Sequence, residues 1–166
     1  LTEEMGKALD DRDHNLVFGG GDSGLMGAAA RGFRAGGAHI VGVIPRFFIR
    51  ESVEAICDDC DELITPETMR ERKLLMEDMA DAFIVTPGGI GTLEEFFEIL
   101  TLKQLCRHNK PIAIYNINGY YNEILHAIEV ATKKNFIRGG CLDLFKICEN
   151  TDELFAYIET PERQRE

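Results

Sequence analysis

The chain has too few basic residues, and no apolar run of sufficient length, to fit several large classes of protein. Eighteen lysines and arginines stand against 29 aspartates and glutamates, so the net charge at pH 7 is −11. A charge of this sign disfavours binding to nucleic acid or to an anionic membrane surface. No apolar segment has the length that crosses a bilayer, and the visible N-terminus lacks the pattern of a secretory signal. We therefore expect a small-molecule partner, with neither nucleic acid nor membrane.

Cysteines are few as well, and their number is odd. Five cysteines dispersed along 166 residues fit reduced thiols in the cytoplasm better than a disulfide framework. A zinc site at Cys57 and Cys60 would need two further ligands, but the chain has no second C-x-x-C and no paired histidines. Asp58 and Asp59 would raise the pKa of the two thiols, which argues against a redox couple. We expect no metal and no cofactor, and we interpret the four histidines as structural or surface residues.

Short apolar runs alternate with helical patterns along the whole sequence. Strands are predicted at 16–18, 38–44, 82–86, 111–115 and 144–148, and helices near 2–11, 23–36, 66–80, 92–108, 120–135 and 151–158. Helix starts are marked by Thr65 before Pro66, and by Asn150 with Glu153. The alternation is typical of a doubly wound, Rossmann-like α/β fold with an open parallel sheet. The length suits a single domain over 1–166.

The first predicted element is unusual for this fold. The chain opens on a helix, although a doubly wound sheet normally begins with a strand and a ligand loop. Leu1 is also an unusual mature N-terminus. We expect a further strand before Leu1, and we expect a fragment without it to be less stable and less active, because backbone groups of the sheet would lack partners.

A glycine-rich loop between the strand at 82–86 and the next helix predicts a phosphate site. Backbone N–H groups and the positive end of a helix dipole attract anions at such a place. Alternatively, Thr92 and Glu95 form a T-x-x-E capping box that only starts the helix, but this does not explain three glycines within four residues. The predicted phosphate ligands are the N–H groups of Gly89, Ile90 and Gly91 and the hydroxyl of Thr92, with Gly88 in the same loop.

An earlier glycine cluster has a similar arrangement. Gly19, Gly21 and Gly24 match the G-x-G-x-x-G pattern of dinucleotide sites, after a strand and before a helix. The next strand ends in Pro45-Arg46, however, so no acid stands where a ribose hydroxyl would be bound. The sequence therefore disfavours NAD binding.

Two basic residues lie on the apolar stripe of the helix predicted at 66–80. Arg72 and Lys73 fall between Met69 and Met76 at helical spacing. Bases at such positions either extend to the surface or meet a ligand or an acid in a cleft. The glycine loop after the next strand favours the ligand, because both features belong to the carboxyl edge of the sheet.

Three motifs together carry a family resemblance. The run 19–27 with three successive glycines, the run Met69-Arg70-Glu71-Arg72-Lys73 and the run 87–95, P-G-G-I-G-T-L-E-E, resemble the Lonely Guy family of nucleotide phosphoribohydrolases, formerly mislabelled as lysine decarboxylases. The resemblance covers nearly the whole chain. It implies cleavage of the N-glycosidic bond of a nucleoside 5′-monophosphate, such as a cytokinin riboside monophosphate or AMP, to free base and ribose 5′-phosphate.

The resemblance also implies roles for individual residues. Arg72 and Glu95 correspond to the catalytic pair, since a carboxylate near C1′ stabilises an oxocarbenium-like sugar and a guanidinium can hold the leaving group. The substrate contacts that it implies are Gly20, Gly21, Glu54, Lys73, Glu94 and Thr101, together with the glycine loop at 88–92.

Two other functions remain to be weighed against the hydrolase, and the sequence also predicts a homodimer. A non-catalytic nucleotide or molybdenum-cofactor carrier shares the glycine loop, but it would not need Glu95 near C1′. Lys73 as a pyridoxal-phosphate lysine is disfavoured, because the chain lacks a second helical domain and a partner for the ring nitrogen. We expect a homodimer through the helix carrying Arg72 and the Phe96, Phe97 and Leu100 face, the alternative being core packing alone.

Overall fold

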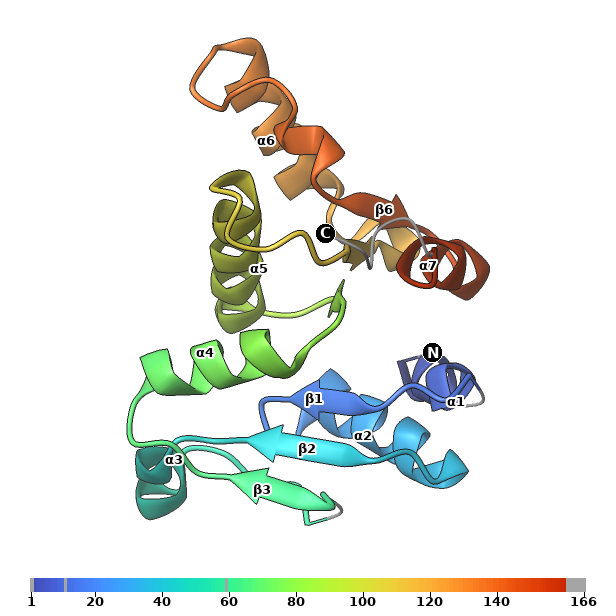
Figure 1. Cartoon of the computed structure of the whole chain (residues 1–166), viewed down its shortest axis with the longest axis vertical. Coiled ribbons are helices and arrows are strands. Elements are labelled where there is room, and N and C mark those ends of the chain that lie inside the picture. The colour runs from blue at the N-terminus through green and yellow to red at the C-terminus, as the bar shows by residue number, and fades with distance from the viewer. Residues whose placement is uncertain (1, 11, 59, 161–166) are drawn as a thin grey trace. The chain divides into compact units, whose positions relative to one another are not determined.

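The computed structural model of the chain describes residues 2–10, 12–58 and 60–160. It divides into two compact units, one over 1–80 and one over 81–166. Each unit contains a three-stranded, fully parallel sheet with helices between its strands (Figure 1). The ligand-binding edge of such a sheet is the one at which its strands end, so the candidate ligand loops of each unit are those that follow its strands.

The first unit orders its strands β1-β2-β3. Its elements are α1 (Thr2–Asp10), β1 (Leu16–Phe18), α2 (Gly24–Gly36), β2 (Ile40–Val43), α3 (Arg46–Glu51), β3 (Glu62–Ile64) and α4 (Met69–Met79). The central strand β2 is buried along its whole length, as expected for a strand covered on both faces. Phe18 at the end of β1 lies opposite Gly42, and Val43 lies opposite Ile64.

Helix α4 begins later than the sequence analysis predicts. Its N-cap is Thr68, whose side chain accepts a hydrogen bond from the Glu71 backbone N–H at 3.2 Å, while the Glu71 carboxylate accepts from the Thr68 N–H at 3.1 Å. This capping box satisfies two helix-start N–H groups at once. The predicted start at Thr65 and Pro66 is therefore wrong by one turn.

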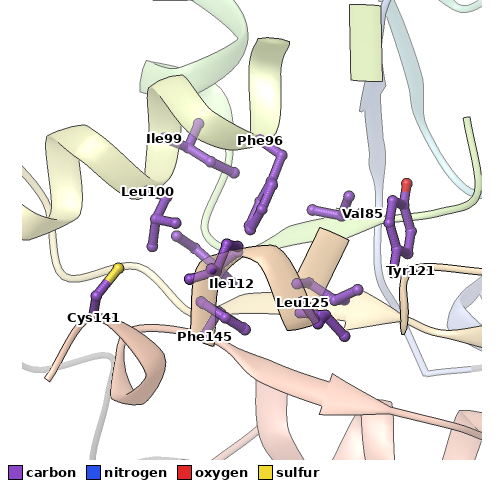
Figure 2. Packing of buried hydrophobic residues seen from close by; sticks show 11 residues of the cluster. Val85, Phe96, Ile99, Leu100, Ile112, Tyr121, Leu125, Cys141 and Phe145 are labelled. Atoms are coloured by element: carbon purple, nitrogen blue, oxygen red, sulfur yellow. The ribbon is translucent and has the colours of Figure 1, made fainter. Parts of the chain in front are cut away.

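The second unit orders its strands β4-β5-β6. Its elements are β4 (Phe83–Val85), α5 (Ile90–Gln104), β5 (Ile112–Tyr115), η1 (Ile117–Gly119), α6 (Asn122–Lys133), η2 (Cys141–Asp143), β6 (Lys146–Cys148) and α7 (Thr151–Ile158). Figure 2 shows the hydrophobic cluster between these elements, to which Val85, Phe96, Leu100, Tyr121 and Leu125 contribute. The start of α7 is as predicted, since the Asn150 side chain accepts from the Glu153 N–H at 2.9 Å.

The predicted fold class is confirmed as doubly wound α/β, and every predicted strand and helix is present, with the predicted ends for β1 and α7 and shifted ends for the others. The sequence analysis missed β3 and α3, and in the described residues the strands pair as two sheets of three. The single domain over 1–166 and the strand before Leu1 stay predictions. Within the described residues, none of the helices combines the length and apolar character needed to cross a membrane.

Candidate functional site

The glycine loop after β1 is held by the segment that follows α3. The Cys57 N–H donates to the Gly20 carbonyl at 2.9 Å, the Asp22 N–H donates to the Ala55 carbonyl at 2.8 Å, and Gly21 forms a bridge with Ile56. Gly20 has a φ of +74°, a conformation that glycine adopts without steric cost. These contacts fix the loop at the carboxyl edge of the first sheet.

Two predicted contact residues, Gly21 and Glu54, come together at this loop. A Cβ at Gly21 would overlap the Glu54 carboxylate, so the absence of a side chain allows the carboxylate to lie against the loop. The Ser23 hydroxyl donates to Glu54 Oε1 at 2.8 Å. Ser23 is also the N-cap of α2, but its side chain makes no capping bond. The sequence analysis missed Ser23, because serine before a helix normally indicates only a cap.

Arg72 is the buried residue of α4, with a relative exposure of 9%. Its Nε donates to the Val43 carbonyl at 3.1 Å, at the carboxyl end of β2. The guanidinium lies so close to Gly19 that a Cβ there would overlap Nη2. The alternative of an exposed surface base is therefore wrong for Arg72, and Gly19 joins the candidate residues. Lys73, next along the helix, is half-buried.

The glycine loop after β4 leads directly into α5. The N-cap of this helix is Gly89, and no side chain caps it. Thr92 is the third helical residue, so the predicted T-x-x-E capping box of Thr92 and Glu95 is wrong. A Cβ at Gly88 would overlap the Thr92 hydroxyl, which places this hydroxyl against the loop. Open N–H groups at a helix start are suited to an anion.

The three remaining predicted residues lie on α5. Glu95 is half-buried, and Glu94 and Thr101 are exposed. The Thr101 hydroxyl donates to the Phe97 carbonyl at 2.6 Å, one turn earlier in the same helix, which is a common local partner for threonine.

Two tyrosines that the sequence analysis did not single out contact the loop after β4. The Tyr120 hydroxyl donates to the Gly88 carbonyl at 2.8 Å, and the Tyr121 hydroxyl donates to the Thr86 carbonyl at 2.5 Å. Burial raises the pKa of Tyr121 to about 12, so this phenol remains a donor at neutral pH. Their position in the segment between β5 and α6 was the available signal, because neighbouring parallel strands end at one edge of the sheet.

Taken unit by unit, the predicted site residues form two groups. Gly20, Gly21, Glu54, Arg72 and Lys73 belong to the first unit, and 88–92, Glu94, Glu95 and Thr101 belong to the second. In the first group, the loop 19–21 contacts both Glu54 and Arg72. In the second, one loop and the helix that follows it carry every member. The role of each residue stays a prediction.

The five cysteines are free thiols. Burial is the largest cause that raises the pKa of Cys60 to about 12, followed by its hydrogen bond with Cys57. The expected rise is present at Cys60, where burial is its largest cause, whereas the sequence analysis attributed it to Asp58 and Asp59. Burial also raises the pKa of Cys148 to about 11, and Cys106 is exposed. Among the described residues, no three His, Cys, Asp or Glu side chains gather as a metal site would require.

Open parallel sheets with glycine loops at the ends of their strands define the class of doubly wound α/β proteins. Residues 26–158 match the family model described as "Possible lysine decarboxylase". A probable cytokinin riboside 5′-monophosphate phosphoribohydrolase of Oryza sativa subsp. japonica is 40% identical over 93% of this chain and 66% of its own length. A cytokinin riboside 5′-monophosphate phosphoribohydrolase of Rhodococcoides fascians is 40% identical over 97% of this chain and 81% of its own length. The chain therefore belongs to the Lonely Guy family.

The length of the match differs between these relatives. The chain spans about two thirds of the rice protein and more of the bacterial one. Among solved structures, the molybdenum cofactor carrier protein of Chlamydomonas reinhardtii aligns over 95% of this chain and 83% of its own, with a TM-score of 0.68 and 18% identity. The molybdenum cofactor binding protein of Rippkaea orientalis gives a TM-score of 0.66 at 18% identity, with the same coverage. Identities this low show a shared fold alone.

Proposed function

We propose that the protein is a hydrolase that cleaves the N-glycosidic bond of purine nucleoside 5′-monophosphates. Water adds at C1′, the bond from C1′ to the purine nitrogen breaks, and the purine leaves with a proton beside ribose 5′-phosphate. The phosphoribohydrolase activity for which the relatives are named supports this. The structural observation that carries it is Arg72, whose guanidinium lies against Gly19 and the Val43 carbonyl, at the edge where the strands of the first sheet end and where open α/β sheets bind ligands.

The proposed roles follow from the charges that develop during the reaction. The sugar becomes oxocarbenium-like and positive at C1′, and a carboxylate stabilises it and can orient water. We assign this role to Glu95. Negative charge moves onto the departing purine, and we assign its stabilisation to Arg72. The phosphate binds the N–H groups of Gly89, Ile90 and Gly91, where α5 begins without a side-chain cap.

The other predicted residues are proposed as further substrate contacts. Glu54 is suited to ribose hydroxyls, because Ser23 occupies its Oε1 and Oε2 can accept from a second donor. We also propose contacts from Lys73, Glu94 and Thr101. A carrier of a nucleotide or of molybdenum cofactor is the second candidate, but its structural support is a likeness at 18% identity, which concerns the fold.

Phosphate recognition gives the first testable result. We expect kcat/KM for AMP or an N6-modified AMP to exceed that for the corresponding nucleoside by about 10²-fold or more, because charge-assisted hydrogen bonds contribute roughly 1.5–3 kcal/mol each. Chromatographic detection of released base from both substrates measures the ratio. Equal values would contradict the phosphate site, and binding without any release of base would favour the carrier.

We also propose a homodimer, with a change in the surface first predicted. Phe96 and Leu100 lie in the core of the second unit, so they are not free to form an interface.

Leu74 on α4 is 57% exposed. We expect Leu74→Glu to shift the sedimentation coefficient at micromolar concentration from dimer to monomer, because a charge in a subunit interface is strongly destabilising. Phe136→Glu, at a residue that is 86% exposed, is the matched control. A monomeric parent protein would refute the dimer.

A cytoplasmic location is proposed as well. Its support is the five free thiols, since a reducing compartment keeps cysteines in this form.

A further inference from the structure

Two adjacent tyrosines hold the loop that precedes α5. Both phenols donate to backbone carbonyls of this loop, Tyr121 to Thr86 and Tyr120 to Gly88. The two rings are perpendicular, with centroids 5.0 Å apart. Two adjacent phenols therefore donate to two carbonyls that lie two positions apart in the same loop.

The local structure after β5 fixes where these tyrosines stand. The buried side chain of Asn116 accepts from the Tyr121 N–H at 2.8 Å and donates to Asn122 Oδ1 at 2.9 Å. The intervening turn needs positive φ at Asn118 (52°) and Gly119 (70°). The ring of Tyr121 packs in the hydrophobic cluster (Figure 2), whereas Tyr120 is 54% exposed.

The two accepting carbonyls differ in whether the next residue supplies an N–H group. In a trans peptide the C=O and the following N–H point in opposite directions, and no described peptide bond is cis. With the Gly88 carbonyl turned to Tyr120, the N–H of Gly89 points away from the phenol. The Thr86 carbonyl is followed by Pro87, which has no N–H. The Tyr120 contact therefore orients a potential ligand group, and the Tyr121 contact does not.

The helix start continues the same pattern. The Gly89 carbonyl accepts from the Leu93 N–H at 3.1 Å inside α5, so the N–H of Ile90 points out of the helix start. Gly89 is the N-cap, and no side-chain hydrogen bond caps this end of the helix. Two successive N–H groups are thus oriented, one of them by Tyr120.

We propose that Tyr120 is a positioning residue for phosphate binding, which holds the Gly88–Gly89 peptide so that the Gly89 N–H donates to a phosphate oxygen of the substrate. The inference rests on the proposed function, because it assumes that the loop binds the 5′-phosphate. Tyr120 itself does not touch the reacting atoms. It acts by keeping one peptide plane in place, which saves the entropy of ordering it when the ligand binds.

The test compares Tyr120→Phe with Tyr121→Phe, two variants that each remove one hydroxyl and leave the ring. For Tyr120→Phe we expect calorimetry with ribose 5′-phosphate to show about fivefold to tenfold weaker binding, the equivalent of one net hydrogen bond. KM for the nucleotide should rise with kcat nearly unchanged, and the slow cleavage of the nucleoside should be unaltered. The melting temperature should stay close to that of the parent, since Tyr120 is half-exposed.

Tyr121→Phe should show the opposite pattern. Its hydroxyl bonds the Thr86 carbonyl from within the core, so we expect a lower melting temperature and parent-like affinity for ribose 5′-phosphate. If Tyr120→Phe binds ribose 5′-phosphate as the parent does, or if Tyr121→Phe loses as much affinity, the inference is wrong. A parent protein that binds ribose 5′-phosphate but cleaves no nucleotide would refute the proposed hydrolase and leave this comparison valid.

Discussion

Replacing Glu95 by glutamine is expected to lower kcat for a purine nucleoside 5′-monophosphate by roughly 10²-fold or more, with nucleotide binding largely retained. The amide keeps the shape of the side chain and removes the negative charge that would stabilise an oxocarbenium ion at C1′. Single-turnover release of base, measured beside equilibrium binding of the nucleotide, separates the two effects.

Glu94→Gln is the matched control, because it makes the same chemical change one position earlier on α5, at an exposed residue. Its effect on kcat should be much smaller than that of Glu95→Gln. A Glu95 variant that turns over at the parent rate would remove the catalytic assignment, and equal losses at both positions would assign the effect to the helix as a whole.

Replacing Arg72 by lysine should lower kcat roughly tenfold to a hundredfold, even though the positive charge is kept. Arginine offers a planar group with several donors, and Arg72 uses Nε to bond the Val43 carbonyl at 3.1 Å. That bond orients the rest of the guanidinium, whereas lysine offers one flexible ammonium group. Steady-state kinetics and thermal melts on the same preparations distinguish a loss of chemistry from a loss of folding.

Gly19→Ala tests the position of the Arg72 guanidinium by changing the residue against which it lies. The added methyl group would overlap Nη2 of Arg72, so the guanidinium must move, and kcat should fall in the same direction by a smaller factor. Gly37→Ala is not a suitable control, because φ there is +102° and alanine would be strained. Gly139 has open space and no positive φ, so Gly139→Ala should leave activity unchanged.

The sequence predicts most of the fold because the strongest elements carry local signals. Strand β1 and helix α7 have the predicted ends, since a short apolar run and an asparagine cap mark them. Strand β3 was missed because two of its three residues are exposed, which leaves no apolar run to recognise. Helix α3 was missed for a related reason, since its six residues include none that is buried.

For the candidate site, the motifs indicate which residues gather but not how they are held. Glycines 88 to 91 and Arg72 stand out in the sequence. The partners that position them do not, because Val43 contributes only a carbonyl and Tyr120 contacts a residue 32 positions earlier. Contacts of this range depend on strand order, which a single sequence does not specify. Ser23 was missed for another reason, because a serine directly before a helix is normally interpreted as its N-cap.

The unequal environments of the cysteines have a practical consequence for spectroscopy. Maleimides and related reagents react with thiolates, so thiols whose pKa is about 11 or 12, such as Cys148 and Cys60, react slowly at neutral pH. Cys106 is exposed and lies just beyond the last residue of α5. Because a helix of 15 residues is about 22 Å long, a fluorophore on Cys106 would stand a helix length from Gly89. The natural sequence thus offers a labelling position for following ligand binding without engineered cysteines.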